Sequence, residues 1–157
     1  DKKGVVTAGT SSPLTDGAAA VIVCSENYAK TNNLKIMAYI RGMAISGCSP
    51  EIMGIGPVLS SQKALKRAGI DLKDIDIIEM NEAFAAQSLA CVKELGIDMS
   101  KLNIHGGAIA MGHPLGASGA RITGKAASLL QETGKKYALS TMCVGGGQGC
   151  ATVLERA

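Results

Sequence analysis

Residues 75–96, IDIIEMNEAFAAQSLACVKELG, decide the fold class because they join two different patterns within one stretch of chain. Residues 75–80 are almost continuously apolar, which predicts a short buried strand. Apolar side chains at helical spacing follow at Phe84, Cys91 and Leu95. A glycine comes directly after Leu95, as at many helix C-termini. A strand that leads straight into a helix is the repeating unit of α/β domains.

Similar patterns lie on both sides of this stretch. We expect further strands at residues 36–47, 102–105, 137–144 and 150–155, and helices at residues 59–68 and 118–133. Residues 145–149, Gly-Gly-Gly-Gln-Gly, make a connection short enough for a hairpin, so the last two strands should be antiparallel. The prediction is a layered α/β/α domain with a mostly parallel mixed sheet, helices on both faces and an antiparallel C-terminal strand.

The first 35 residues differ from this pattern. Residues 4–9 and 21–24 have strand character, and residues 25–33 look polar and helical. The composition changes near residues 33–36, which predicts a boundary between a segment at 1–35 and a domain at 36–157. The chain begins with Asp1 and not with Met, so we expect a piece of a longer protein.

Composition and charge exclude several classes of protein. The chain has 157 residues, 46% hydrophobic and 18% charged, which is enough for a full core and excludes a disordered protein. No apolar stretch reaches the roughly 18 residues that cross a bilayer, so we expect no membrane partner. The net charge of +3 gives no reason to expect a nucleic-acid partner.

The cysteines indicate neither disulfides nor a metal site. They stand at positions 24, 48, 91, 143 and 150, an odd number without a Cys-x-x-Cys pair, and with the two histidines they lack zinc-ligand spacing. We therefore expect no metal. No signal peptide is visible, which favours the cytoplasm, or the mitochondrial or peroxisomal matrix in a eukaryote.

Three loops after predicted strands could carry chemistry, since function in open α/β sheets gathers beyond the carboxyl ends of strands. Asn81 follows the strand at 75–80 and is either a helix cap or a polar site residue. His113, in a glycine-rich loop, is either a core histidine or a general base. Cys143 is either inert packing or an acid or base, and the glycines that begin at Gly145 could direct N–H groups at a developing oxyanion.

Two other features have simpler interpretations. Residues 119–125 have the glycine and lysine spacing of a phosphate-binding loop. However, Ala126 occupies the position where Ser or Thr would bind magnesium, and the segment has a helical pattern. His105 is most simply a strand-end residue beside the site, although a supporting role stays open.

Taken together, the three loops resemble the thiolase family. The motifs are Asn-Glu-Ala-Phe-Ala from Asn81, Gly-His-Pro around His113, and Cys143 with its glycines, separated by 32 and 30 residues. The segment from Val6 through Ser12 to Ala20 also looks like the thiolase stretch that precedes the C-terminal half. The resemblance covers essentially the whole chain, and four motifs in order are far more specific than any one.

The resemblance implies a thiolase-like C-terminal domain at 36–157, preceded by the tail of the N-terminal domain at 1–35. It implies an acyltransferase that exchanges acyl groups between 3-ketoacyl-CoA, CoA and acetyl-CoA, with coenzyme A and acyl-CoA as substrates and no permanently bound cofactor. The nucleophilic cysteine of the family belongs to the N-terminal half, and none of the five cysteines here matches it. The isolated chain should therefore be inactive, and the full enzyme should be a homodimer or homotetramer.

The resemblance also implies a role for each matched residue. His113 matches the group that activates the nucleophile and helps hold the thioester oxygen. Asn81 matches the residue that positions a water in the same oxyanion hole, and the N–H of Gly145 matches a donor of a second hole. Cys143 matches the acid/base of the carbon–carbon step, and Ser12 falls where the family contacts the pantetheine of CoA.

Two alternatives stay open. A ketoacyl synthase shares the layered fold but carries a second His, or an Asn, where Cys143 stands, which favours a thiolase. A non-catalytic CoA-binding or assembly module is the second alternative. Residues 47–57 look more like 3-ketoacyl-CoA thiolases of fatty-acid degradation, but acetoacetyl-CoA specificity stays open as well.

Overall fold

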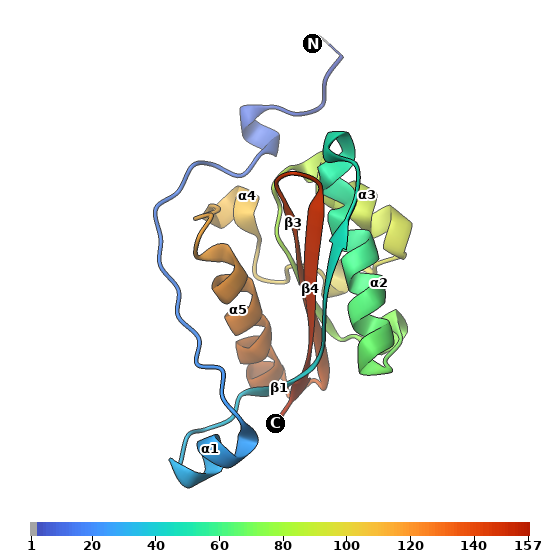
Figure 1. The fold of residues 1–157 in the computed structure, drawn as a ribbon. Coiled ribbons are helices and arrows are strands. Elements are labelled where there is room, and N and C mark those ends of the chain that lie inside the picture. Colours follow the sequence, from blue (N-terminus) through green and yellow to red (C-terminus); the bar gives the residue numbers. More distant parts are fainter. Residues whose placement is uncertain (1–2) are drawn as a thin grey trace.

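Residues 3–157 are described by a computed structural model, in which a four-stranded sheet lies between helices (Figure 1). The strands are β1 (Ala38–Gly47), β2 (Ile77–Met80), β3 (Tyr137–Val144) and β4 (Gln148–Arg156). The α-helices are α1 (Glu26–Thr31), α2 (Gly56–Ala68), α3 (Ala85–Leu95), α4 (Ala108–Met111) and α5 (Ser118–Thr133). Within residues 3–157, no helix is both long enough and apolar enough to cross a membrane.

The sheet has the order β1-β4-β3-β2. Strand β4 is antiparallel to both β1 and β3, whereas β2 and β3 are parallel. Three strands therefore run the same way and the C-terminal strand runs the other way, which confirms the predicted mixed sheet and hairpin. The sequence did not indicate that β4 would lie between β1 and β3, and this insertion makes two of the three described pairings antiparallel.

Helices cover both faces of the sheet, as predicted. Figure 1 shows α2 and α3 on one side and α5 on the other. Neighbouring residues of a strand alternate between the two cores: Ile78 belongs to the cluster under α2 and α3, and Ile77 belongs to the cluster under α5. Since both faces of β2 are buried, its sequence is apolar almost throughout.

Small residues allow α2 to lie directly against the sheet. A Cβ added to Gly42 would stand 2.4 Å from the carbonyl oxygen of Ala64, and one added to Gly149 would stand 2.1 Å from that of Gly56. These approaches leave no room for side chains between the backbones. The scarcity of aromatic residues follows from this close packing, because large rings would separate the layers.

The helix ends agree well with the sequence patterns. Gly69 and Gly96 follow α2 and α3 in the left-handed conformation, with φ values of 67° and 69°, as the predicted C-terminal glycines should. Helix α2 begins at Gly56, three residues earlier than expected, because Pro57 is well suited to the first turn of a helix.

The predicted strands at 4–9 and 21–24 are wrong. These residues are not in strands, and the first segment instead ends in a short 3-10 turn at Ala8–Thr10. Their apolar side chains are exposed, for example 67% at Val5 and 82% at Ile22. A strand needs a hydrogen-bonding neighbour, and none lies beside these segments within residues 3–157.

The predicted strand at 102–105 is also wrong. Leu102 makes one isolated parallel bridge to Ile78, and the chain then turns at Asn103, where φ is +44°. Asn tolerates this left-handed conformation better than most residues, so the turn replaces the strand.

We predict that Ser61→Ala stabilises the protein, because the Ser61 hydroxyl is buried in α2 without a hydrogen-bond partner. Removing an unsatisfied hydroxyl and gaining the helix propensity of alanine should raise the free energy of unfolding by about 1 kcal/mol. Chemical denaturation measures this change.

The neighbouring Ser60 provides the matched control. It is equally buried, but its hydroxyl donates to the carbonyl oxygens of Gly56 and Pro57, each at 3.2 Å. Ser60→Ala should therefore be neutral or destabilising. A loss of stability in Ser61→Ala as large as that in Ser60→Ala would contradict the prediction.

Candidate active site

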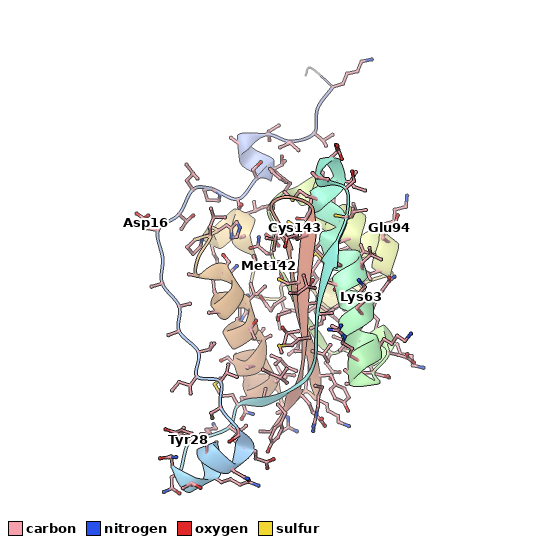
Figure 2. The ribbon with its side chains drawn as sticks, in the orientation of Figure 1. Asp16, Tyr28, Lys63, Glu94, Met142 and Cys143 are labelled. Carbon is pink, nitrogen blue, oxygen red and sulfur yellow. The ribbon has the colours of Figure 1, made fainter. Side chains whose placement is uncertain are left out.

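The candidate site lies at the carboxyl edge of the two parallel strands. Asn81 follows β2 and Cys143 lies near the end of β3, and the backbone N–H of Asn81 donates to the carbonyl of Thr141 at 3.0 Å. Because β2 and β3 are parallel neighbours, both residues are at the same edge of the sheet. Figure 2 shows Cys143 at the end of the sheet that also bears α4.

The structure brings Asn81 and His113 together, although 32 residues separate them. The Nδ2 atom of Asn81 lies 3.4 Å from the Nε2 atom of His113. Asn81 is fully buried, and its Oδ1 atom has no hydrogen-bond partner. Interpreting Asn81 as a helix cap is wrong, because the N-cap position of α3 is Phe84. Asn81 therefore offers buried polar atoms that α3 does not use.

His113 is held on its other ring nitrogen by a residue that the sequence analysis missed. Ser118 Oγ lies 2.6 Å from Nδ1 of His113, and the backbone N–H of His113 donates to Thr15 Oγ1 at 3.2 Å. Burial, and secondly the positive charge of Arg121, lower the pKa of His113 below its ordinary value of 6.5. The imidazole is therefore neutral at neutral pH, as a general base must be.

A network of buried and half-buried polar groups supports the His113 loop. The Glu82 carboxylate accepts from Asn103 Nδ2 at 2.7 Å and from the backbone N–H of Ile109, in α4, at 3.1 Å. A Cβ on Gly107 would lie 2.2 Å from this carboxylate, so a side chain there would displace the Glu82 carboxylate from its hydrogen bonds. Neither Glu82 nor Asn103 was predicted as a supporting residue, since nothing in their local sequence reveals these distant partners.

Lys125 adds a second support from α5. Its ammonium donates to the carbonyl of Gly106 at 2.9 Å and lies 3.1 Å from the buried carboxylate of Glu79. Burial raises the pKa of Glu79, and the charge of Lys125 opposes this shift. Residues 119–125 lie inside α5, which confirms the helical pattern predicted for them. His105 is exposed, and its charge acts on Glu79.

Cys143 is a buried thiol, 6% exposed. Burial is the main cause that raises its pKa from 9.0 to about 11, with smaller contributions from Cys91, Cys150 and Cys48. The thiol is therefore protonated at neutral pH. The structure describes all five cysteines as free, and no metal-binding group of three or more His, Cys, Asp or Glu occurs within residues 3–157.

The glycine turn after Cys143 is tightly constrained on one side and open on the other. Gly146 and Gly147 have φ values of 84° and 85°, and a Cβ on Gly147 would stand 2.2 Å from the carbonyl oxygen of Cys48. Gly145 is exposed, and a Cβ there would meet no atom within 4 Å. The side of the turn that carries Gly145 is therefore open.

The N-terminal segment crosses two of the three loops. Ser12 donates its backbone N–H to the carbonyl of Ala83 at 3.1 Å, which places Ser12 beside the Asn81 loop. A few residues later, Thr15 contacts the His113 loop, and a Cβ on Gly112 would stand 2.3 Å from its Oγ1 atom. This segment is therefore part of the wall of the candidate site.

Comparison with known proteins agrees with this geometry. The family model "Thiolase, C-terminal domain" matches residues 34–156, and the model "Thiolase, N-terminal domain" matches residues 1–27. A layered α/β domain with these loops at its carboxyl edge is thus a domain of the thiolase type. The chain belongs to the thiolase family, which confirms the resemblance and the predicted fold class.

Individual relatives are similar over nearly the whole chain. The 3-ketoacyl-CoA thiolase of Vibrio parahaemolyticus is 58% identical over 156 residues, which are 98% of this chain and 40% of that protein. The human mitochondrial 3-ketoacyl-CoA thiolase structure is 52% identical with a TM-score of 0.98, covering 100% of this chain and 40% of that one. The acetyl-CoA acetyltransferase structure of Bacillus anthracis is 43% identical with a TM-score of 0.94, covering 97% and 39%. The chain thus spans about two fifths of the length of these relatives.

We predict that Cys143 resists alkylation until strongly alkaline pH. At pH 8 a thiol with a pKa of about 11 has about a hundredfold less thiolate than one with a pKa of 9.0, and only the thiolate reacts. Iodoacetamide labelling, followed by mass spectrometry of each cysteine peptide across pH 7–12, measures the midpoint. The exposed Cys24 controls for reagent quality. A midpoint for Cys143 at or below pH 9 would contradict the burial argument.

Proposed function

We propose that this chain forms the C-terminal part of a thiolase, which transfers acyl groups between 3-ketoacyl-CoA, CoA and acetyl-CoA. The observation that carries the proposal is the contact between Asn81 and His113 at the sheet edge where Cys143 also lies. The names of the similar proteins support the substrate class, and one solved relative is the human enzyme in complex with CoA. Coenzyme A and its thioesters are then substrates, with no permanently bound cofactor.

In the proposed reaction an upstream cysteine attacks the 3-keto carbon of the substrate. The bond between C2 and C3 breaks, the acyl group stays on the cysteine as a thioester, and acetyl-CoA leaves as its enolate. CoA thiol then attacks the acyl-enzyme and releases the shortened acyl-CoA. Covalent catalysis of this kind needs a base for the nucleophile, an acid for the enolate and donors for two oxyanions.

His113 is the proposed base. Its pKa is lowered by burial, so the imidazole has a free lone pair at neutral pH and takes the proton of the upstream thiol. Protonated His113 then donates to the thioester oxygen, together with a water positioned by Asn81. Each such donor is worth about 3 kcal/mol of barrier.

Cys143 is the proposed acid. Its raised pKa keeps the thiol protonated, so it can give its proton to the enolate carbon and remove one in the reverse direction. The backbone N–H of Gly145, at the open side of the turn, is the proposed donor to the second oxyanion. Ser12, beside the Asn81 loop, is the proposed contact to the pantetheine of CoA.

The proposed partner of this chain is the upstream half of the enzyme. The segment at residues 4–24 exposes an unusual amount of apolar surface. The exposed fraction is 67% at Val5, 101% at Leu14, 82% at Ile22 and 73% at Val23. An upstream half that packs against residues 4–24 would cover these side chains and supply the nucleophile. We also propose that the whole enzyme is a homodimer or homotetramer.

We predict that residues 1–157 alone catalyse no measurable thiolysis of acetoacetyl-CoA, because none of their cysteines matches the nucleophile of the family. The longer protein that contains this chain should be active, and light scattering should find a dimer or tetramer. Robust thiolysis by the isolated chain would contradict the proposal, and a monomeric longer protein would contradict the assembly. An inactive longer protein that still binds CoA would favour the non-catalytic alternative.

We predict opposite labelling results for the two catalytic residues in the longer protein. Cys143→Ala should lose at least a hundredfold in thiolysis and condensation but still accept an acetyl group on the upstream cysteine, because only proton transfer to carbon is removed. His113→Ala should slow the acetylation as well. Labelling with radioactive acetyl-CoA measures both, and Cys24→Ala, an exposed cysteine, is the control. Acetyl groups found on Cys143 would contradict its proposed role.

A further inference from the structure

The two ring nitrogens of His113 have different neighbours, and these neighbours determine where the proton of the neutral ring resides. Nδ1 lies 2.6 Å from Ser118 Oγ, and Nε2 lies 3.4 Å from Asn81 Nδ2. A neutral imidazole carries one proton, on either nitrogen, and only the unprotonated nitrogen can act as a base. The bonding of Ser118 and Asn81 therefore matters for any chemistry at His113.

The hydroxyl of Ser118 has a single hydrogen, and a second acceptor is available for it. Ser118 Oγ donates to the carbonyl oxygen of Pro114 at 3.1 Å, four residues earlier, which is a common bond for a serine in the first turn of a helix. With its hydrogen used there, Oγ has only lone pairs to offer to His113. It then accepts a hydrogen bond from Nδ1–H.

The other side of the ring leads to the same assignment. The amide nitrogen of Asn81 can only donate, so the nitrogen that it faces, Nε2, has to be the acceptor. The two neighbours come from different elements, α5 and the loop after β2, so they are independent observations. Both neighbours favour the proton on Nδ1.

We propose that Ser118 is a positioning residue that holds His113 as the Nδ1–H tautomer, with the lone pair of Nε2 directed to the Asn81 side. Ser118 is fully buried and is the first residue of α5, so its hydroxyl has little freedom to move. The catalytic meaning of this tautomer rests on the proposed function, but the tautomer itself is a property of these contacts.

The assignment explains how the ring can take a proton without changing its bond to Ser118, while the Asn81 amide gives up its bond to Nε2. When Nε2 accepts the proton of a thiol, the imidazolium carries N–H groups on both nitrogens, and Ser118 Oγ still accepts from Nδ1. The opposite tautomer would present an N–H to the thiol and would have to rotate or exchange protons first. Burial and the nearby charge of Arg121 favour the neutral ring before this step.

The direct test is nuclear magnetic resonance of the protein labelled with ¹⁵N-histidine, at pH 7.5. We expect Nδ1 of His113 to have the chemical shift of a protonated ring nitrogen and Nε2 that of an unprotonated one. His105, exposed and without these neighbours, provides an internal comparison. The reverse pattern at His113 would overturn the proposal whether or not the protein is a thiolase.

Variants test the part that Ser118 plays. Ser118→Ala should shift His113 toward a mixture of tautomers, whereas Ser128→Ala, at an exposed position of the same helix, should leave the pattern unchanged. An unchanged Nδ1–H pattern in Ser118→Ala would show that Ser118 does not control the proton. If Ser118→Ala fails to fold, the pattern of the unmodified protein decides alone.

The longer protein gives the kinetic readout. Ser118→Ala should slow acetylation of the upstream cysteine about tenfold, with little change in the KM for acetyl-CoA, because the residue contacts the base and not the substrate. An increase in KM with unchanged kcat would contradict the positioning role. Absence of acetylation in the unmodified protein would overturn the proposed function, while an Nδ1–H signal at His113 would still support the tautomer.

Discussion

The side-chain amide of Asn103 connects the end of β2 to the loop that carries His113, and the geometry of the site depends on this contact. Asn103 accepts from the backbone N–H of Met80 and donates to its carbonyl, both at 2.9 Å, where the strand ladder ends. Its second N–H binds Glu82, which in turn accepts from the first turn of α4. Because every member is buried or half-buried, loss of one leaves others unsatisfied, so the network holds as a unit. Asn81 lies in the chain between Met80 and Glu82, which this network holds, and His113 lies at the end of the loop that the network supports.

Sequence patterns correctly predicted the helices and strands whose own apolar residues show which face is buried. The helix at 118–133 and the strand at 137–144 were predicted with the bounds that the structure has, since their apolar periodicity is strong. The segments 4–9, 21–24 and 102–105 were mistaken for strands because an apolar run does not reveal whether a neighbouring strand exists. The place of β4 inside the sheet also depends on distant pairing, which no local pattern encodes.

In the candidate site, too, local sequence patterns revealed some residues, and contacts between distant parts of the chain determined the others. Asn81 and Cys143 could be selected because they lie at the ends of the parallel strands β2 and β3, which meet at one edge of the sheet. His113 was selected from its glycine-rich loop, although the strand predicted before that loop does not form. The sequence did not point to Thr15, Glu82 or Ser118. Thr15 and Glu82 bind residues far away in the chain, and the contact of Ser118 depends on the shape of a turn. Ser118 lies only five residues from His113, but its contact depends on the turn through Pro114 that returns the chain to the ring.

Burial acts on His113 and Cys143 in opposite directions, and the result is a matched pair of neutral groups. It lowers the pKa of the imidazole and raises that of the thiol, so near neutral pH one group has a free lone pair and the other holds a proton. The same shifts affect folding. Below pH 6.5 the unfolded chain binds a proton at His113 that the folded chain resists, and above pH 9.0 it releases one at Cys143 that the folded chain retains. The His113 shift therefore opposes folding below pH 6.5 and the Cys143 shift opposes it above pH 9.0, whereas neither costs stability between these two values, where both groups are neutral in the folded protein.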